Sequence, residues 1–355
     1  MNTHPPPPGI APDRNHAAFI TVARQEMCPV CRQSGSALYS DLKDLFSGVE
    51  GRWAMRACSR CRIAWLTRKP PKSDFAKLYR NYFTHSMEGP GPVPGPIREK
   101  IKNAALARLL GRPPGAAPRI VRIAGILATL IPRYRELLLA SIQWLAGMEN
   151  GTLLDVGCGD GTFLKRMRDL GWSVRGIDPD RQAVQRAREN FALDVVAARL
   201  EEHRFRDDFF DAVVVSHVIE HVHDPVSLLT ECRRILKPGG KIVLLTPNYV
   251  GLQRRWLGRS WIGLDCPRHL FLFSRRSLGR CSEIAGLRVV TLRTTARAAK
   301  IFWLLSRART SAGWPTPQRK PPGLRIEAFF YDWIERAALL FWPDAGAEIL
   351  LIAGK

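Results

Sequence analysis

The stretch from Thr152 to Gly161 reads Thr-Leu-Leu-Asp-Val-Gly-Cys-Gly-Asp-Gly and is the most informative part of the chain. Its first half has the apolar character of a buried strand, and glycines follow at positions 157, 159 and 161. A helical spacing of apolar residues begins at Phe163. Glycines at a strand-to-helix turn let the chain bend sharply and let a ligand approach the main chain. The helix N-terminus behind them offers free N–H groups and a positive dipole end.

Strands and helices alternate along the chain after this loop. We expect strands at 172–177, 194–197, 211–215, 241–246 and 347–355, helices at 181–190 and 226–236, and a turn at 237–240. The run 211–215 is apolar on both faces, as in a buried parallel strand. This order predicts an α/β fold with a doubly wound, mostly parallel sheet.

The loop differs from the dinucleotide-binding pattern, because its spacing is Gly-x-Gly-x-Gly and an aspartate precedes it on the strand. It resembles motif I of the class I S-adenosylmethionine-dependent methyltransferases, with their seven-stranded, Rossmann-like sheet. The resemblance implies that S-adenosylmethionine is the cofactor. The residues it assigns to cofactor binding are Asp155, Gly157, Cys158, Gly159, Gly161, Asp178, Leu200 and Ser216.

Asp178 has two interpretations. A carboxylate at the end of the second strand is where a doubly wound fold binds ribose hydroxyls. The segment Asp178-Pro179-Asp180 also precedes a helix, so either acid could cap that helix. Asp180 suits the cap better, which leaves Asp178 for the ribose.

The segment from Ser216 to Pro225 resembles the H-V-L-E-H-V-x-D-P motif of small-molecule methyltransferases. It supplies three candidate catalytic residues, His217, Glu220 and His221. We expect His221 to act as general base for an acceptor hydroxyl, with Glu220 orienting it or the acceptor. The alternative is that Glu220 and His221 stabilise the fold.

Two further features bear on the acceptor site. His269, in Pro-Arg-His-Leu, is a candidate acceptor-site residue, and Arg268 beside it could bind an anion. The E-x-x-E-H segment of ubiquinone-pathway O-methyltransferases resembles a divalent-metal site. His217 replaces its first glutamate here, which disfavours that metal.

Two Cys-x-x-Cys pairs, Cys28 with Cys31 and Cys58 with Cys61, stand 26 residues apart. Two such knuckles place four thiolates around Zn²⁺, as in zinc ribbons. The alternative is disulfides or unrelated thiols, and the absence of a secretory signal ahead of them favours reduced thiols. Four thiolates fill the coordination sphere, so the zinc is expected to be structural.

The sequence suggests four parts: a disordered, proline-rich segment at 1–26, a zinc-ribbon-like module at 27–66, a linker and helical segment at 67–149, and a methyltransferase domain at 150–355. No transmembrane segment is expected. The pieces 120–131 and 328–342 could rest on a membrane surface, although packing against the catalytic domain is favoured. We therefore expect a cytoplasmic protein, at most peripheral to the inner face of the membrane.

The net charge is +22, and residues 251–325 hold 16 basic against two acidic side chains. Such a surface attracts anions, or is simply a solvated basic face. The layout, with a tyrosine-rich segment at 79–85, resembles bacterial methyltransferases of polysaccharide and sugar pathways. It implies O-methylation of a small hydroxylated acceptor, a sugar or glycan, anionic where it is nucleotide- or lipid-linked.

Two rival functions stay open. Some ribosomal-RNA methyltransferases pair a zinc module with this fold, and the charge favours nucleic acid. The histidine-rich motif and the missing Asn-Pro-Pro-Tyr signature disfavour that partner. The other rival is a scaffold that binds the cofactor without turnover.

Overall fold

The computed structural model describes residues 25–45, 49–71, 74, 78, 96–111, 117–148, 150–308 and 323–355. Most of the N-terminal segment expected to be disordered, the tyrosine-rich segment and nearly all of the Pro/Gly-rich linker at 88–96 lie outside these residues. Within the described parts of the chain, no helix combines the length and apolar character needed to cross a membrane.

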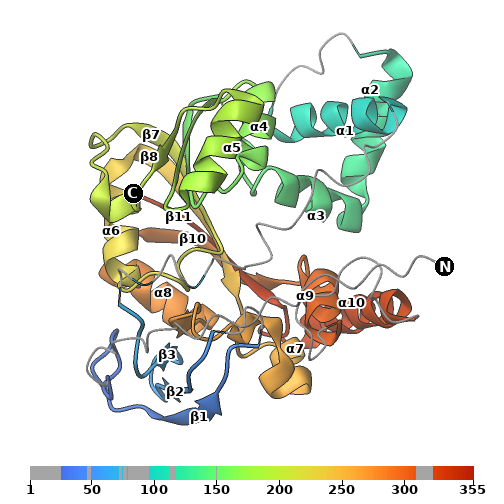
Figure 1. Cartoon of the computed structure of the whole chain (residues 1–355). Helices are drawn as coiled ribbons and strands as arrows, with labels where there is room; N and C mark the ends of the chain where they lie inside the picture. The colour runs from blue at the N-terminus through green and yellow to red at the C-terminus, as the bar shows by residue number, and fades with distance from the viewer. Residues whose placement is uncertain are drawn as a thin grey trace, which may run out of the picture.

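A seven-stranded sheet in the order β10-β11-β8-β7-β4-β5-β6 organises the molecule (Figure 1). Its strands are β4 (Thr152–Val156), β5 (Ser173–Asp178), β6 (Val195–Ala197), β7 (Phe210–Ser216), β8 (Leu236–Pro247), β10 (Arg288–Thr295) and β11 (Glu348–Gly354). Pairing is parallel from β8 to β6, and β11 lies antiparallel between β8 and β10. This is the class I methyltransferase topology, so the predicted fold class is confirmed.

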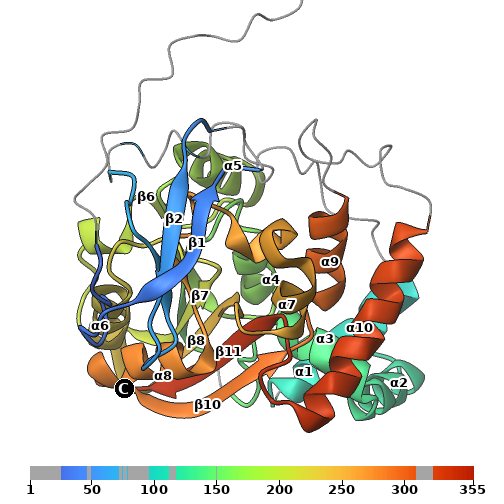
Figure 2. The same cartoon turned by 90° about the horizontal axis from the view of Figure 1, so that it is seen from below.

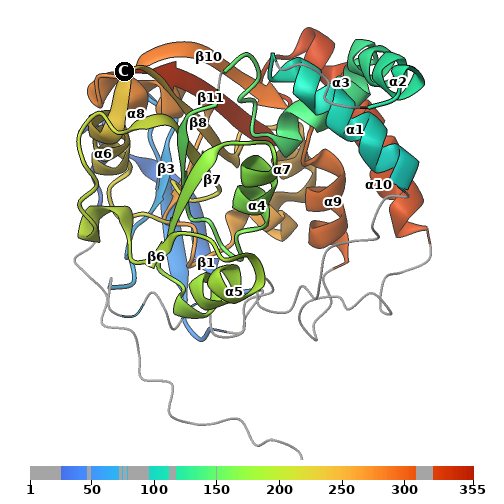
Figure 3. The same ribbon diagram turned by 90° about the horizontal axis from the view of Figure 1, so that it is seen from above.

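Helices cover one face of the sheet, as Figure 3 shows from above. They are α1 (Pro96–Leu109), α3 (Pro132–Ser141), α4 (Thr162–Asp169) and α5 (Arg181–Phe191). Leu106, Leu138 and Leu164 from these helices share a core with Leu153 and Leu350 of the sheet. The helical segment before the glycine loop therefore belongs to the same packed body as the sheet.

The opposite face is covered by α6 (Pro225–Ile235), α8 (Arg275–Ile284) and the cysteine-containing segment. The core here joins Leu154 and Val213 of the sheet to Leu229, Leu278 and Met55. The remaining helices are α2 (Arg119–Leu130), α7 (Leu252–Leu257), α9 (Ala299–Arg307) and α10 (Leu324–Phe341).

A second, four-stranded sheet has the order β1-β2-β3-β9. The strands β1 (Ser36–Leu42), β2 (Trp53–Ala57) and β3 (Ala64–Leu66) come from the cysteine-containing segment, whereas β9 (Phe271–Leu272) comes from far along the chain. Packing and strand pairing therefore cross both of the proposed boundaries, near residue 66 and near residue 150.

The turn predicted at 237–240 is wrong as an element boundary, because β8 runs through it. Leu236 pairs with Phe210 ahead of a register shift in the β7–β8 ladder, so pairing begins before the glycines. Gly239 still has a left-handed backbone, with φ of 78°. The residues therefore keep the backbone of a turn, but pairing with β7 continues on both sides of it, so the turn becomes an irregularity within β8.

Candidate active site and metal centre

The glycine loop connects β4 to α4, and all three of its glycines have positive φ. A Cβ at Gly157 would lie 2.3 Å from Val218 Cγ2, and one at Gly161 would lie 2.5 Å from Leu193 Cδ1. Larger residues at these two positions would clash with the fold itself. A Cβ at Gly159 would meet no atom within 4 Å, so the loop is open to a ligand at that point.

Asp178 ends β5 and is bonded to the glycine loop. Its Oδ2 accepts a hydrogen bond from the Gly159 N–H at 2.9 Å, and its Oδ1 accepts one from the Asp180 N–H at 2.8 Å. Asp180 caps α5 by accepting from the Gln182 N–H. The two acids thus have the separate positions that the sequence suggested. Each oxygen of a carboxylate has two lone pairs, so Asp178 also has capacity for ribose hydroxyls.

The other predicted cofactor residues lie at or after the carboxyl ends of the parallel strands β4, β6 and β7. Asp155 is buried on β4, and burial together with the nearby charge of Asp178 raises its pKa well above the usual range. Cys158 and Leu200 are buried, and Ser216 ends β7. An open glycine loop beside a carboxylate fits the amino-acid and ribose parts of S-adenosylmethionine. These assignments remain predictions.

His217 follows β7 with φ of 56° and joins an ion-pair network. Its Nε2 lies 2.8 Å from Glu348 Oε1, and its Nδ1 lies 3.4 Å from Glu220 Oε1. Arg297 Nε donates to Glu348 Oε2 at 2.8 Å. Burial opposes the imidazolium, but the hydrogen bonds to Glu220 and Glu348 outweigh it and raise the pKa of His217 to about 9. His217 is therefore protonated at neutral pH and unsuited to act as a general base.

Both carboxylates of this network are ionised. Burial alone would raise their pKa values, but the His217 hydrogen bond lowers the pKa of Glu220 to about 2, and Arg297 does the same for Glu348. Thr246 Oγ1 donates to Glu220 Oε2 at 2.9 Å. Glu220 is thus fixed in place by groups from β8 and from the loop after β7.

His221 and His269 face each other, with ring centroids 4.6 Å apart. Nδ1 of His221 lies 3.1 Å from the Arg268 carbonyl oxygen, and Nδ1 of His269 lies 2.7 Å from the Gly263 carbonyl oxygen. A carbonyl only accepts, so both Nδ1 atoms carry the proton and Nε2 is the basic nitrogen of each ring. Burial, followed by the neighbouring His269, lowers the pKa of His221 to about 4, so this imidazole is neutral at pH 7.

One ligand atom each of Glu220, His221 and His269 lies within 4.8 Å of the others. Two imidazoles and a carboxylate, with the Nδ1 atoms oriented by carbonyls, form a donor set that suits a divalent ion. The structure therefore brings all four predicted catalytic residues together, since His217 pairs with Glu220. Three of them, Glu220, His221 and His269, form the candidate metal-binding group.

The expectation that Arg268 binds an anion is wrong. Its guanidinium is completely buried and donates to Asp265 Oδ1 at 2.6 Å and to Asp44 Oδ1 at 2.7 Å. The charge is neutralised within the fold, and the side chain joins the N-terminal sheet to the methyltransferase part.

Three functional residues of this network, Glu348, Arg297 and Thr246, were not predicted from the sequence. Glu348 opens the otherwise apolar strand β11, and an acid in such a strand was a usable signal. Arg297 and Thr246 carry no local signal, because their role arises only when β8, β11 and the segment before α9 meet.

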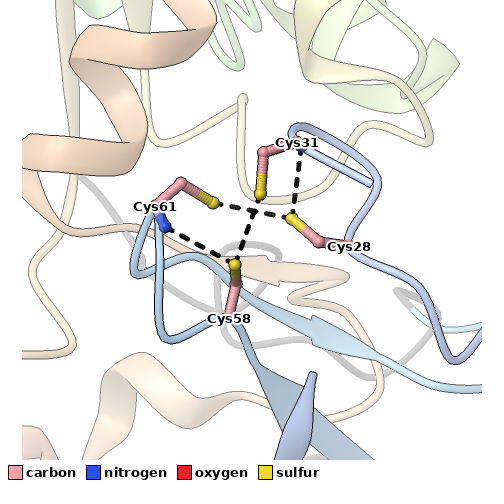
Figure 4. A group of neighbouring side chains, drawn as sticks. All are labelled: Cys28, Cys31, Cys58 and Cys61. Atoms are coloured by element: carbon pink, nitrogen blue, oxygen red, sulfur yellow. Dashed lines mark hydrogen bonds between the residues drawn. The ribbon is translucent and has the colours of Figure 1, made fainter. Parts of the chain in front are cut away.

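The four knuckle cysteines converge, as Figure 4 shows. The Sγ atoms of Cys28 and Cys61 lie 3.5 Å apart and those of Cys31 and Cys58 lie 3.4 Å apart, too far for a disulfide. The Cys31 N–H donates to Cys28 Sγ and the Cys61 N–H to Cys58 Sγ, both at 3.5 Å. Zinc–sulfur bonds of 2.3 Å in a tetrahedron would separate the sulfurs by about 3.8 Å, so the donor set fits Zn²⁺.

Residues 128–292 match a family model described as a methyltransferase domain. The curated relatives include ubiquinone biosynthesis O-methyltransferases. That of Alkalilimnicola ehrlichii is 42% identical over 113 residues, covering 30% of this chain and 45% of that protein. The human mitochondrial enzyme is 36% identical over 133 residues, covering 33% and 35%. The chain thus spans half or less of the length of these relatives.

A solved S-adenosylmethionine-dependent methyltransferase from Archaeoglobus fulgidus aligns with 65% of this chain and 93% of its own, at 22% identity and a TM-score of 0.41. The sheet topology, and not this weak similarity, identifies the fold. The sheet topology is that of the class I methyltransferase fold, and the match to the methyltransferase-domain model is confined to residues 128–292. Among the curated relatives are O-methyltransferases of ubiquinone biosynthesis.

Proposed function

We propose that the protein is an S-adenosylmethionine-dependent O-methyltransferase that acts on a small hydroxylated acceptor. The observation that carries the proposal is the hydrogen bond from Gly159 to Asp178, which joins an open glycine loop to the acid at the end of β5. The cofactor, when bound, supplies an electrophilic methyl group. The acceptor oxygen forms a bond to that methyl carbon as the carbon–sulfur bond breaks, and the acceptor proton must leave.

His221 is the residue we propose to receive that proton, at Nε2. Its Nδ1–H is held by the Arg268 carbonyl, which fixes the ring and its tautomer. Glu220 lies beside it as a fixed carboxylate that favours the imidazolium formed by proton transfer. Where a divalent ion is bound by Glu220, His221 and His269, these residues would instead hold the acceptor hydroxyl near the ion, which would lower the pKa of the hydroxyl.

For the acceptor, the relatives favour a hydroxylated compound of the ubiquinone-pathway type over the sugar or glycan implied by the sequence layout. One apolar ring beside the site supports this choice, since the ring centroid of Phe302 lies 6.0 Å from that of His217. The ribosomal-RNA alternative is not favoured by these relatives.

The test is methyl transfer from labelled S-adenosylmethionine to catechols of the ubiquinone-precursor type, with nucleotide sugars and ribosomal RNA in parallel. We expect labelled phenol ether from the catechols, and loss of product in His221→Gln with S-adenosylhomocysteine affinity retained. Labelled sugar or RNA would reject the proposed acceptor. Cofactor binding without any product would favour the inactive scaffold.

A further inference from the structure

The helices α2 and α10 carry their apolar residues on the outside. Leu127 and Leu130 of α2 are exposed, as are Phe330, Trp333 and Phe341 of α10. The exposed fractions of Leu127 and Phe330 are 56% and 60%, and that of Phe341 is 88%. Each set follows a helical stripe, so it is a continuous feature of its helix and not a scatter of single residues. We call these five residues the apolar face.

The two helices lie on the same side of the molecule in Figures 1 and 2. Ion pairs and a cation–π contact join α10 to the start of α3, which follows α2 directly. Arg133 pairs with Asp332 of α10 at 3.1 Å, and its guanidinium lies 5.6 Å from the Trp333 ring centroid. Arg336 of α10 pairs with Glu136 of α3 at 2.6 Å. The α2–α3 corner is therefore held against α10.

The charged residues of these helices are also distributed unevenly, with the acids buried or paired and arginines exposed. Two of the three acids of α10, Asp332 and Glu335, are buried, and the third, Glu327, pairs with Arg307. Helix α2 contains no acid at all, and its Arg119 and Arg122 are exposed. Acids turned inward, with aromatic, aliphatic and arginine side chains turned outward, match the interface of an anionic lipid membrane.

We propose that α2 and α10 dock this protein on an anionic lipid surface. The apolar face enters the headgroup region, while the arginines contact lipid phosphates. A second copy of the chain fits this face less well. Its arginines would lie against the arginines of the first copy, and α2 and α10 expose no acids to pair with them.

Docking here would bring the candidate active site close to the lipid. Phe302 of α9 contacts the His217 ring, and the next residue, Trp303, stacks on Tyr331 of α10 at 3.9 Å between centroids. One helix layer thus separates the apolar face from the site. A lipophilic acceptor would reach the site with a short passage through water, although docking itself does not rest on the proposed function.

The test is co-sedimentation of the zinc-loaded full chain with phosphatidylcholine vesicles, with and without phosphatidylglycerol. We expect binding to the anionic vesicles that weakens as salt rises. Leu127→Glu and Phe330→Glu should each weaken it about tenfold or more, since each replaces an apolar group that would enter the lipid with a charge that the anionic surface repels. Val290→Glu is the matched control, because Val290 of β10 is 57% exposed and lies outside the apolar face.

Circular dichroism shows whether each variant is folded, and size-exclusion chromatography gives its oligomeric state. Absence of vesicle binding by the folded wild-type chain would overturn the proposal. So would an equal loss in Val290→Glu, or a wild-type dimer that both helix variants convert to monomer. Methyl transfer to a water-soluble acceptor is measured separately, so failure of docking and failure of the proposed activity give different results.

Discussion

Asp178 and Asp180 are two acids with the same chemistry and different tasks. The first accepts hydrogen bonds from Gly159 and from Asp180, and the second caps α5. We expect Asp178→Ala to weaken S-adenosylhomocysteine binding at least about tenfold, since hydrogen bonds to a charged group contribute roughly 1.5–3 kcal/mol each. Calorimetric titration measures this.

Asp180→Ala is the matched control. Loss of the cap should lower the free energy of unfolding by about 1 kcal/mol and leave the affinity nearly unchanged. Equal losses of affinity in the two variants would assign both acids to the integrity of the loop, and would remove the special role of Asp178.

The His217 network predicts a pH dependence of stability. The folded-state pKa of His217 is raised to about 9, so its contribution is fully present below its unfolded value near 6.5 and is lost as pH rises through 9. The wild-type advantage over His217→Gln in urea unfolding should therefore shrink between pH 6.5 and 9. An upper bound on the change is about 3 kcal/mol.

The carboxylate side of the network behaves in the opposite direction. The pKa of Glu348 is lowered to about 2, so its contribution is present above the ordinary value near 4.5 and is lost as pH falls through 2. A stability difference between wild type and His217→Gln that stays constant from pH 6.5 to 9 would contradict a charged His217.

Among the elements, β9 depends most on distant parts of the chain. It completes the N-terminal sheet by pairing with β3, and Arg268 just before it bridges Asp44 and Asp265. Asp44→Asn leaves the buried Arg268 guanidinium with one of its two acidic partners, Asp265, so it should cost about 3 kcal/mol in urea unfolding, the low end for a broken buried pair. Arg52→Ala, which breaks the exposed pair with Asp41, should leave the free energy of unfolding nearly unchanged, because solvent screens that pair. If the two variants lose similar amounts of unfolding free energy, water must solvate the Arg268 guanidinium in place of Asp44.

The elements themselves were largely predictable, because their signals are local. Asp224 and Pro225 begin α6 as cap and first-turn residue, and the strand from Asp211 is apolar on both faces. What failed was set by tertiary pairing. The sequence around Gly239 predicts a turn, but pairing with β7 makes it part of β8. Arg268 reads as an anion-binding residue until Asp44, 224 residues away in sequence, is brought against it.

For the site too, residues with local sequence signals could be predicted, and contacts between distant segments could not. The glycine loop and the histidine-rich motif are contiguous in sequence, so their residues could be named in advance. His269 could be named only as a candidate, since its place beside His221 depends on how the 262–272 segment folds back. Glu348 reaches His217 across 131 residues, and no spacing rule predicts that contact.

At the scale of the whole molecule, backbone hydrogen bonds join the cysteine-containing segment to the half of the site that holds Glu220 and His269. The Leu66 N–H donates to the Leu270 carbonyl, and the Leu270 N–H donates to the Glu220 carbonyl, at 2.9 and 2.8 Å. The N-terminal sheet thus holds the segment that carries His269, whereas the glycine loop is built from β4, β5 and α4. A Zn²⁺ ion held by the four thiolates would support this segment, so its removal should disturb acceptor turnover while cofactor affinity persists.

Cys58→Ser tests this coupling, with Cys232→Ser as the same substitution at a buried thiol of α6 outside the cluster. We expect Cys58→Ser alone to lose bound zinc and to lower the free energy of unfolding by roughly 4 kcal/mol or more, the range reached when a metal site is lost. Its S-adenosylhomocysteine affinity should stay close to wild type while kcat falls, because the disturbed contacts are those of His269 and Glu220. Parallel loss of cofactor affinity would mean that the cysteine centre supports the whole sheet, since the shared core on that face contains Cys28 and Cys58 together with Leu154.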